Sequence, residues 1–189
     1  MQAAFIVFDG MTSLDFIGFY DPITRLKSMK IIDDFAWNVC SLAAEITDDR
    51  GLKLKADTVG GTLSHYDMLV VPGGFGTRKL QHDEKFMAWI KTASDVPLKV
   101  SVCTGALILG AAGFLKGRRA TTHPSAYREL EPYCETVVRE RVVDEGTIIT
   151  ARGVSSAIDM GLHIVERFAG SEARARVATQ MDYPYQWQV

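Results

Sequence analysis

The sequence predicts an α/β fold with a doubly wound, mostly parallel sheet and helices on both of its faces. Short apolar runs alternate along the chain with longer helix-like runs, as they do in successive β-α-β units. The run at residues 67–71, Asp-Met-Leu-Val-Val, has no polar alternation, which is typical of a strand covered on both faces. No repeat, low-complexity tract or long linker divides the chain, so we expect residues 1–189 to form a single domain.

The elements follow from these runs in chain order. An apolar run predicts the first strand at residues 4–8, and the first helix is expected at residues 13–29, where Thr12-Ser13-Leu14-Asp15 fits the capping-box pattern. Further strands are expected at residues 35–42, 67–71, 99–102, 137–143 and 147–151. Further helices are expected at residues 77–93, 104–112, 125–130, 154–168 and 171–181, and residues 53–61 could add a small hairpin or an edge strand.

Composition and charge exclude several classes of partner. A net charge of −2 gives no basic surface for nucleic acid or for a membrane surface. The longest apolar stretches are far shorter than the roughly 20 residues of a membrane span. The first ten residues lack a basic leader, and the three cysteines are too irregularly spaced for a disulfide framework. We therefore expect a cytoplasmic protein that acts on a small molecule.

Common cofactor motifs are also missing from the sequence. There is no phosphate-binding loop, no Gly-x-Gly-x-x-Gly dinucleotide fingerprint and no paired Cys-x-x-Cys or His-Glu-x-x-His metal motif. The four histidines, at positions 65, 82, 123 and 163, are scattered. We expect neither a cofactor nor a metal.

Cys103 is the strongest candidate for a reactive residue. It follows the apolar run at residues 98–102 and opens a helical run of small residues. A strand that turns into a helix at a cysteine places the sulfur beside unpaired backbone N–H groups, where negative charge is favoured. Because the thiolate is the reactive form of cysteine, this placement predicts a nucleophile. Of the other cysteines, Cys40 is expected to be a core thiol and Cys134 to be incidental.

Three further segments are expected near this cysteine, because ligands bind outside the carboxyl ends of the strands in such folds. Gly73 and Gly74 follow the buried strand and could form an anion-binding nest or a plain turn. Asp15 could cap its own helix or face the sulfur. His123 precedes Pro124, so it could be an N-cap or surface residue, or a base that orients Cys103.

Energetics indicate that the cysteine needs one of these partners. Lowering a thiol pKa from about 8.5 to about 5.5 takes roughly 4 kcal/mol. A helix terminus supplies at most about 2 kcal/mol. A hydrogen bond to a charged group adds about 1.5–3 kcal/mol. A protonated Asp15 or the imidazole of His123 could supply it, and their spacing in the sequence does not rank them.

These segments, in this order, resemble the ThiJ/PfpI superfamily, a branch of the class I glutamine amidotransferase-like fold. The resemblance covers nearly the whole chain, and its most specific pieces lie at residues 70–74, 102–106, 120–124 and 149–153. Residues 13–18 and 101–113 resemble the isonitrile hydratase branch, which has an Asp where many relatives carry Glu. That match falls on Asp15.

The resemblance implies a flavodoxin-like sandwich, a homodimer and a set of roles. Cys103 would be the nucleophile, Asp15 its acidic partner, and the backbone N–H groups of Gly74 and Thr104 an anion-stabilising pair. His123 matches a superfamily position, although a complete Cys–His–acid triad is not evident in the sequence.

The reaction that the resemblance favours is the hydration of an isonitrile to an N-substituted formamide, which would make the protein a lyase. Three alternatives remain open. One is an α-oxoaldehyde hydratase or deglycase-like activity, with a larger part for His123. Another is a protease-like member of the superfamily. The third is a non-catalytic ligand or redox sensor, in which Cys103 would be oxidised as a signal.

Overall fold

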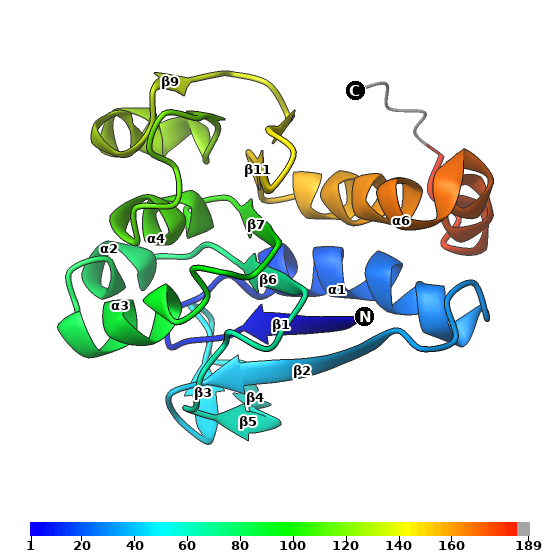
Figure 1. The fold of residues 1–189 in the computed structure, drawn as a ribbon, viewed down its shortest axis with the longest axis horizontal. Coiled ribbons are helices and arrows are strands. Elements are labelled where there is room, and N and C mark those ends of the chain that lie inside the picture. Colours follow the sequence, from blue (N-terminus) through cyan, green and yellow to red (C-terminus); the bar gives the residue numbers. More distant parts are fainter. Residues whose placement is uncertain (185–189) are drawn as a thin grey trace.

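The computed structural model describes residues 1–184, and a sheet of seven strands lies at its centre. Figure 1 shows this sheet with helices packed around it. The strand order is β10-β11-β7-β6-β1-β2-β5. Every neighbouring pair is parallel except β10 and β11, which are antiparallel. The predicted mostly parallel sheet is therefore confirmed. Its strands are β1 (Gln2–Ile6), β2 (Ala36–Ser41), β5 (Thr58–Val59), β6 (Met68–Val71), β7 (Leu98–Val102), β10 (Val142–Asp144) and β11 (Ile148–Ala151).

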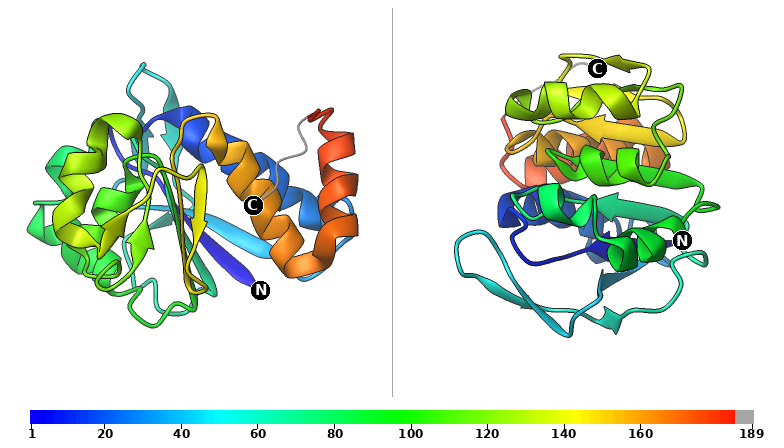
Figure 2. Two further views of the ribbon diagram at one scale, coloured as in Figure 1. Left: turned by 90° about the horizontal axis from the view of Figure 1, so that it is seen from above. Right: turned by 90° about the vertical axis from the view of Figure 1, so that its left-hand side faces the viewer.

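Helices cover both faces of this sheet, as Figure 2 shows from above. On one face, α1 (Ser13–Ser28) and α6 (Ser156–Gln180) lie side by side. The opposite face carries α2 (Thr77–Leu80), α3 (Glu84–Lys91) and α4 (Gly105–Ala111). This doubly wound arrangement is the one that the alternating sequence pattern predicts.

The core lies between the sheet and the helices. All four residues of β6 are buried, as its uninterrupted apolar run predicts. The fully buried Phe5 of β1 makes edge contacts with the rings of Phe16, Phe19 and Tyr20 from α1. These aromatic pairs stabilise the docking of α1 beyond the area that they bury, and α1 is the helix that carries Asp15.

The segment at residues 53–61 supplies both of the elements that the sequence left open. Strand β4 (Lys53–Lys55) forms an antiparallel hairpin with β3 (Glu45–Thr47), and β5 is an edge strand beside β2. A second small sheet pairs β8 (Arg119–Ala120) with β9 (Thr136–Val137). Between them lie the short helices η1 (Pro124–Ala126), α5 (Tyr127–Leu130) and η2 (Glu131–Tyr133).

Two predicted elements are wrong in extent. The helix expected at residues 77–93 is two helices, because Asp83 begins α3 as its N-cap and accepts the Phe86 N–H at 2.8 Å. The strand expected at residues 137–143 is also two, since β9 and β10 belong to different sheets. In contrast, Gly170, with φ of 84°, interrupts α6 where the sequence predicts a break between two helices.

The sheet topology places a ligand site at one edge. From β1 the chain proceeds to β2 on one side of the sheet and later to β6 and β7 on the other. Ligands in such sheets bind outside the carboxyl ends of the strands where the order reverses. The loops after β1, β6 and β7 meet there, and Cys103 follows β7. Within residues 1–184, no helix has the length and apolar composition needed to cross a bilayer.

Candidate functional site

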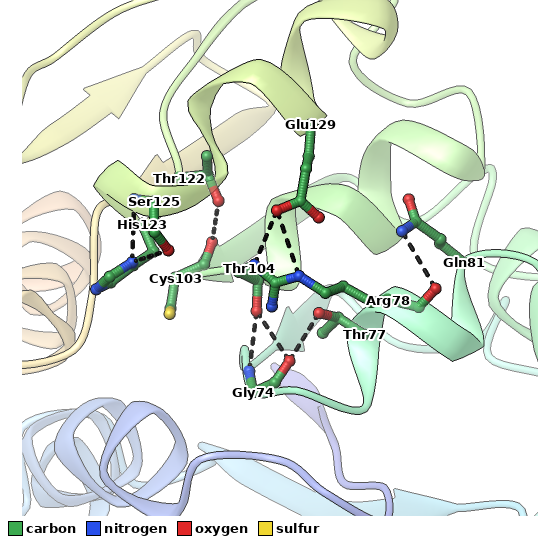
Figure 3. A network of polar contacts seen from close by, with 10 residues as sticks. All are labelled: Gly74, Thr77, Arg78, Gln81, Cys103, Thr104, Thr122, His123, Ser125 and Glu129. Atoms are coloured by element: carbon green, nitrogen blue, oxygen red, sulfur yellow. Dashed lines mark hydrogen bonds and ion pairs between the residues drawn. The ribbon is translucent and has the colours of Figure 1, made fainter.

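Cys103 occupies a sharp turn between β7 and α4. Its φ of 57° lies in the left-handed region, which costs a residue other than glycine about 1–3 kcal/mol. Two hydrogen bonds hold the turn: the Cys103 N–H donates to Ala151 O at 2.9 Å, and the Thr122 hydroxyl donates to Cys103 O at 2.8 Å (Figure 3). The side chain is only 6% exposed and lines a cavity.

Glycines let the neighbouring backbone approach this turn closely. A Cβ atom at Gly153, where φ is 70°, would overlap the Cβ of Cys103. One at Gly73 would lie 2.5 Å from the Thr104 nitrogen and 2.7 Å from the Cys103 Cβ. Strand β6, strand β7 and the loop before α6 therefore meet at the cysteine only because these two positions lack side chains.

Asp15 is fully buried in the first turn of α1 and faces the cysteine rather than capping its helix. The capping box does not form, since the Thr12 hydroxyl donates to Asp49 Oδ2 at 2.8 Å. Asp15 Oδ2 instead accepts the Gly73 N–H at 3.2 Å, and Oδ1 has no hydrogen-bond partner within residues 1–184. The capping interpretation of Asp15 is therefore wrong.

Burial raises the pKa of Asp15 to about 7, against the lowering effects of the Cys103 side chain and the Gly73 N–H. The Asp15 carboxyl and the Cys103 thiol interact through their side chains, and each influences the pKa of the other. A carboxyl with a pKa of about 7 can both accept and release a proton near neutral pH.

Cys103 does not have the lowered pKa expected from its place at the turn. Burial, and then the charge of Asp15, raise the pKa of the thiol to about 12, while the backbone N–H and the hydroxyl of Thr104 partly oppose them. The expectation failed because it counted the donors at the turn without the loss of water around the sulfur. The carboxyl and the thiol are coupled, so a thiolate forms most readily when Asp15 holds a proton.

Gly74 and Thr104 lie together beside the sulfur, with different roles for their N–H groups. The Thr104 N–H interacts with the Cys103 sulfur and favours its thiolate. The Gly74 N–H donates instead to the Thr104 hydroxyl at 2.9 Å, and that hydroxyl lies 3.1 Å from Gly74 O (Figure 3). From the sequence, both N–H groups are expected to stabilise an anion. In the structure the Thr104 N–H is directed at the sulfur, whereas the Gly74 N–H is already hydrogen-bonded to the Thr104 hydroxyl.

His123 lines the same cavity but is bound elsewhere. Its Nδ1 lies 2.8 Å from Ser125 Oγ and accepts the Ser125 N–H at 3.3 Å, which makes it the N-cap of η1. Within residues 1–184, no hydrogen bond joins the imidazole to Cys103 or to a carboxylate. The N-cap interpretation is confirmed, and the structure brings no Cys–His–acid triad together in this part of the chain.

The cavity above the sulfur has a volume of about 200 Å³. Part of this lining is predictable from the sequence. Phe75 and Arg78 directly follow the Gly73-Gly74 turn, which the sequence places at the site. Asp49 and Arg50 come from the loop between β3 and β4, and no motif marks them. The lining residues are Thr12, Asp49, Arg50, Gly74, Phe75, Arg78, Cys103, Thr104, His123, Ser125 and Val154.

The other two cysteines do not line this cavity. Cys40 is fully buried, with its sulfur 3.4 Å from the Tyr66 hydroxyl, so its prediction as a core thiol is confirmed. Cys134 is partly buried after α5. Among the residues that the structure describes, no group of three or more His, Cys, Asp or Glu side chains could hold a metal ion.

Comparison with known proteins gives the same family for most of the chain. Residues 1–167 match the model of the DJ-1/PfpI family. An isonitrile hydratase from Pseudomonas putida is 34% identical over 185 residues, which cover 97% of this chain and 78% of that protein. Protein DJ-1 homolog A from Arabidopsis thaliana is 32% identical over 148 residues, which cover 75% of this chain but 38% of that protein.

Solved structures agree with this likeness. A ThiJ/PfpI family protein from Pseudomonas syringae superposes with a TM-score of 0.89 at 28% identity, covering 100% of this chain and 77% of that one. Drosophila melanogaster DJ-1beta superposes with a TM-score of 0.82 at 24% identity, covering 97% and 98% of the two chains, and shows the fold alone. The ThiJ/PfpI resemblance and the flavodoxin-like sandwich are therefore confirmed, and the chain belongs to the DJ-1/PfpI family.

Proposed function

We propose that the protein is an enzyme that hydrates a small isonitrile, R–NC, to the formamide R–NH–CHO, with Cys103 as nucleophile and Asp15 as proton carrier. The observation that supports it most is the fully buried Asp15, whose pKa of about 7 places a proton acceptor and donor beside a thiol. The identity of 34% to an isonitrile hydratase over 97% of the chain supports this substrate class.

In the first half of the reaction, sulfur and a proton add to the terminal carbon of the isonitrile. Asp15 takes the thiol proton as the sulfur attacks, and the S–C bond forms. The carboxyl then delivers the proton to the same carbon, which gives the thioimidate R–N=CH–S–Cys103. The Thr104 N–H stabilises negative charge on the sulfur as the proton leaves it.

In the second half, water replaces the sulfur. The ionised Asp15 takes a proton from water as the oxygen bonds to the thioimidate carbon, and passes that proton to the nitrogen. The C–S bond then breaks, the hydroxyl becomes the formyl oxygen, and its proton returns to the sulfur by way of Asp15. The sum is R–NC plus H₂O giving R–NH–CHO, with Cys103 and Asp15 restored.

Turnover of cyclohexyl isocyanide, followed by the appearance of the formamide, tests the proposal. Cys103→Ala removes the attacking atom, and we expect it to abolish turnover. Asp15→Asn keeps the size of the side chain but cannot carry the proton, so we expect a loss of about 10²- to 10⁴-fold. Cys134→Ala is the matched control. No turnover by the wild type, or equal turnover by Cys103→Ala and Cys134→Ala, would contradict the proposal.

A second candidate reaction is the hydration of an α-oxoaldehyde such as methylglyoxal to a hydroxy acid. The observation that favours it is His123, which lines the cavity with Cys103 and could move a proton for a carbonyl substrate. Assaying both substrates on one preparation separates the two reactions. If the protein turns over methylglyoxal but no isonitrile, and if His123→Gln loses that turnover, the α-oxoaldehyde is the better assignment of the substrate.

A further inference from the structure

Arg78 lines the cavity above Cys103 and is oriented by neighbours on two sides. Its Nε and Nη2 both donate to one oxygen of Glu129, Oε1, at 3.3 and 2.9 Å (Figure 3). Its guanidinium carbon lies 5.9 Å from the centre of the Phe75 ring. The side chain is 35% exposed, whereas that of Arg50, the other cationic residue of the lining, is 72% exposed. Arg78 is therefore the better ordered of the two guanidinium groups.

Part of this guanidinium remains open to a ligand. Nη1 forms no hydrogen bond within the described residues 1–184, since Glu129 accepts only from Nε and Nη2. An arginine presents five N–H donors in a planar fork, and the fork suits carboxylate and phosphate oxygens. The ion pair with Glu129 therefore orients the guanidinium of Arg78, and its Nη1 remains available as a donor beside the cavity.

The charges that face the cavity favour an anion on this side. The lining contains Arg50 and Arg78 and, among the described residues, a single carboxylic acid, Asp49. The Asp49 carboxylate is already bound on both oxygens, by the Thr12 hydroxyl at 2.8 Å and by Arg50 at 2.9 Å. Glu129 lies behind Arg78, outside the lining. Asp15, beside the sulfur, is fully buried and lies outside this lining. A bound anion would therefore meet the open donors of Arg78 without an unpaired carboxylate in the lining itself.

We infer that Arg78 forms a subsite for an anionic group of the substrate, so that the preferred substrate is a small isonitrile bearing a carboxylate close to its reactive carbon. This inference rests on the proposed function for the identity of the reacting group. The cavity of about 200 Å³ limits the substrate to a small molecule. The carboxylate accepts from Arg78 while the terminal carbon meets the Cys103 sulfur.

The first experiment compares isocyanoacetate with its neutral methyl ester by kcat/KM. A charge-assisted hydrogen bond corresponds to a preference of about 10- to 100-fold for the anion, and we expect Arg78→Gln to remove it. Glu129→Gln frees the rest of the fork, so the preference is expected to persist or grow. Lys79→Gln is the matched control, because it removes the same charge from the next position, which is exposed and outside this lining.

The second experiment does not depend on isonitrile chemistry. Alkylation of Cys103 by iodoacetate and by iodoacetamide, followed by mass spectrometry, compares an anionic with a neutral reagent of similar size. Cys134 in the same chain serves as the internal reference for the intrinsic rates of the two reagents. The iodoacetate-to-iodoacetamide rate ratio at Cys103, relative to Cys134, is expected to fall about tenfold or more in Arg78→Gln but not in Lys79→Gln.

The outcomes separate this inference from the proposed function. An anion preference in alkylation without turnover of either isonitrile supports the Arg78 subsite and contradicts the proposed function. Equal rate ratios in the wild type and Arg78→Gln, or equal shifts in Arg78→Gln and Lys79→Gln, overturn the subsite. If Arg78→Gln does not fold, Glu129→Gln decides: a loss of anion preference there overturns it, and a retained or larger preference supports it.

Discussion

Asp15 and Cys103 form a pair of groups in which each controls the ionisation of the other. The carboxyl is fully buried and its pKa is raised to about 7, mainly because burial disfavours its charge. The charge of the ionised carboxyl in turn raises the pKa of the thiol. The nucleophilicity of Cys103 therefore depends on whether the proton of the pair lies on the carboxyl or on the sulfur. The backbone N–H of Thr104 changes the pKa of the thiol less than burial and Asp15 do.

The raised pKa of Asp15 predicts how stability depends on pH. The folded protein holds this proton up to about pH 7, whereas the unfolded chain releases it near pH 3.8, so ionisation of Asp15 lowers the free energy of unfolding as pH rises between these values. Asp15→Asn removes that cost, which is up to about 4 kcal/mol above pH 7. Urea unfolding at pH 5 and pH 8 should show the variant gaining stability over the wild type mostly at pH 8. An equal difference at both pH values would contradict the pKa.

Thr122 supports the turn without touching the sulfur. It is fully buried and its hydroxyl donates to the Cys103 carbonyl. The neighbouring Thr121 hydroxyl oxygen is also buried and has no hydrogen-bond partner among residues 1–184. Thr122→Val should cost about 0.5–1.5 kcal/mol, since it removes the shorter of two hydrogen bonds to that carbonyl, which also accepts the Ala106 N–H at 3.5 Å, and it should slow alkylation of Cys103. Thr121→Val is the matched control and should cost less. Equal effects of the two substitutions on the free energy of unfolding would show that the hydrogen bond to Cys103 has no special role.

At the scale of elements, the site is made where the loops after β6 and β7 and the loop before α6 meet. The sequence predicts the first two, because Gly73-Gly74 and Cys103 each follow an apolar strand. Residues 149–153 belong to the resemblance to the ThiJ/PfpI superfamily, but no local pattern shows that position 153 must be glycine, since a glycine after a strand is an ordinary turn residue. The requirement for glycine comes from a neighbour far away in the chain, the Cys103 Cβ, which a Gly153 side chain would overlap.

Gly153→Ala should therefore destabilise the protein more than the strain of an alanine with positive φ would by itself. An alanine with positive φ costs about 1–2 kcal/mol, and the contact with Cys103 adds to this. Gly117→Ala is the matched control, because Gly117 has nearly the same φ, 69°, but has open space around its Cβ position. We expect Gly153→Ala to lose more stability in denaturant unfolding and to alter the alkylation rate of Cys103, which Gly117→Ala should leave unchanged. The same loss in both variants would contradict the close approach.

For the whole molecule, local patterns predict the fold better than they predict the ends of elements. Apolar runs and small-residue helices identify the parallel sheet and its helical layers, because both depend on periodicity over five to ten residues. The strand expected at residues 137–143 fails because tertiary pairing assigns its two ends to different sheets. The break before α3 depends on a single N-cap at Asp83, which a longer helical pattern obscures.

The site was predictable in its central residues and much less so in its surroundings. Cys103 and Asp15 stand in recognisable segments, and the structure brings them together. Arg78 lies on α2, directly after the Gly73-Gly74 turn, so its place near the site follows from the chain order. Asp49 and Arg50 reach the cavity through the loop between β3 and β4, whose path depends on packing across the sheet, and the sequence gives no spacing rule for them. The ionisation of Cys103 was mispredicted for the same reason, since burial of the sulfur is a property of the assembled layers.

The proposed chemistry requires Asp15 to exchange a proton near neutral pH, and the most direct test is to titrate that carboxyl. Carbon-13 NMR of selectively labelled aspartate, with Asp15→Asn to assign the signal, measures its pKa in the folded protein. We predict a midpoint of about 7, which burial imposes, and a change in that midpoint in Cys103→Ser. A midpoint near 3.8, the ordinary value for aspartate, would show an acid that is always ionised at neutral pH and would contradict Asp15 as the proton carrier.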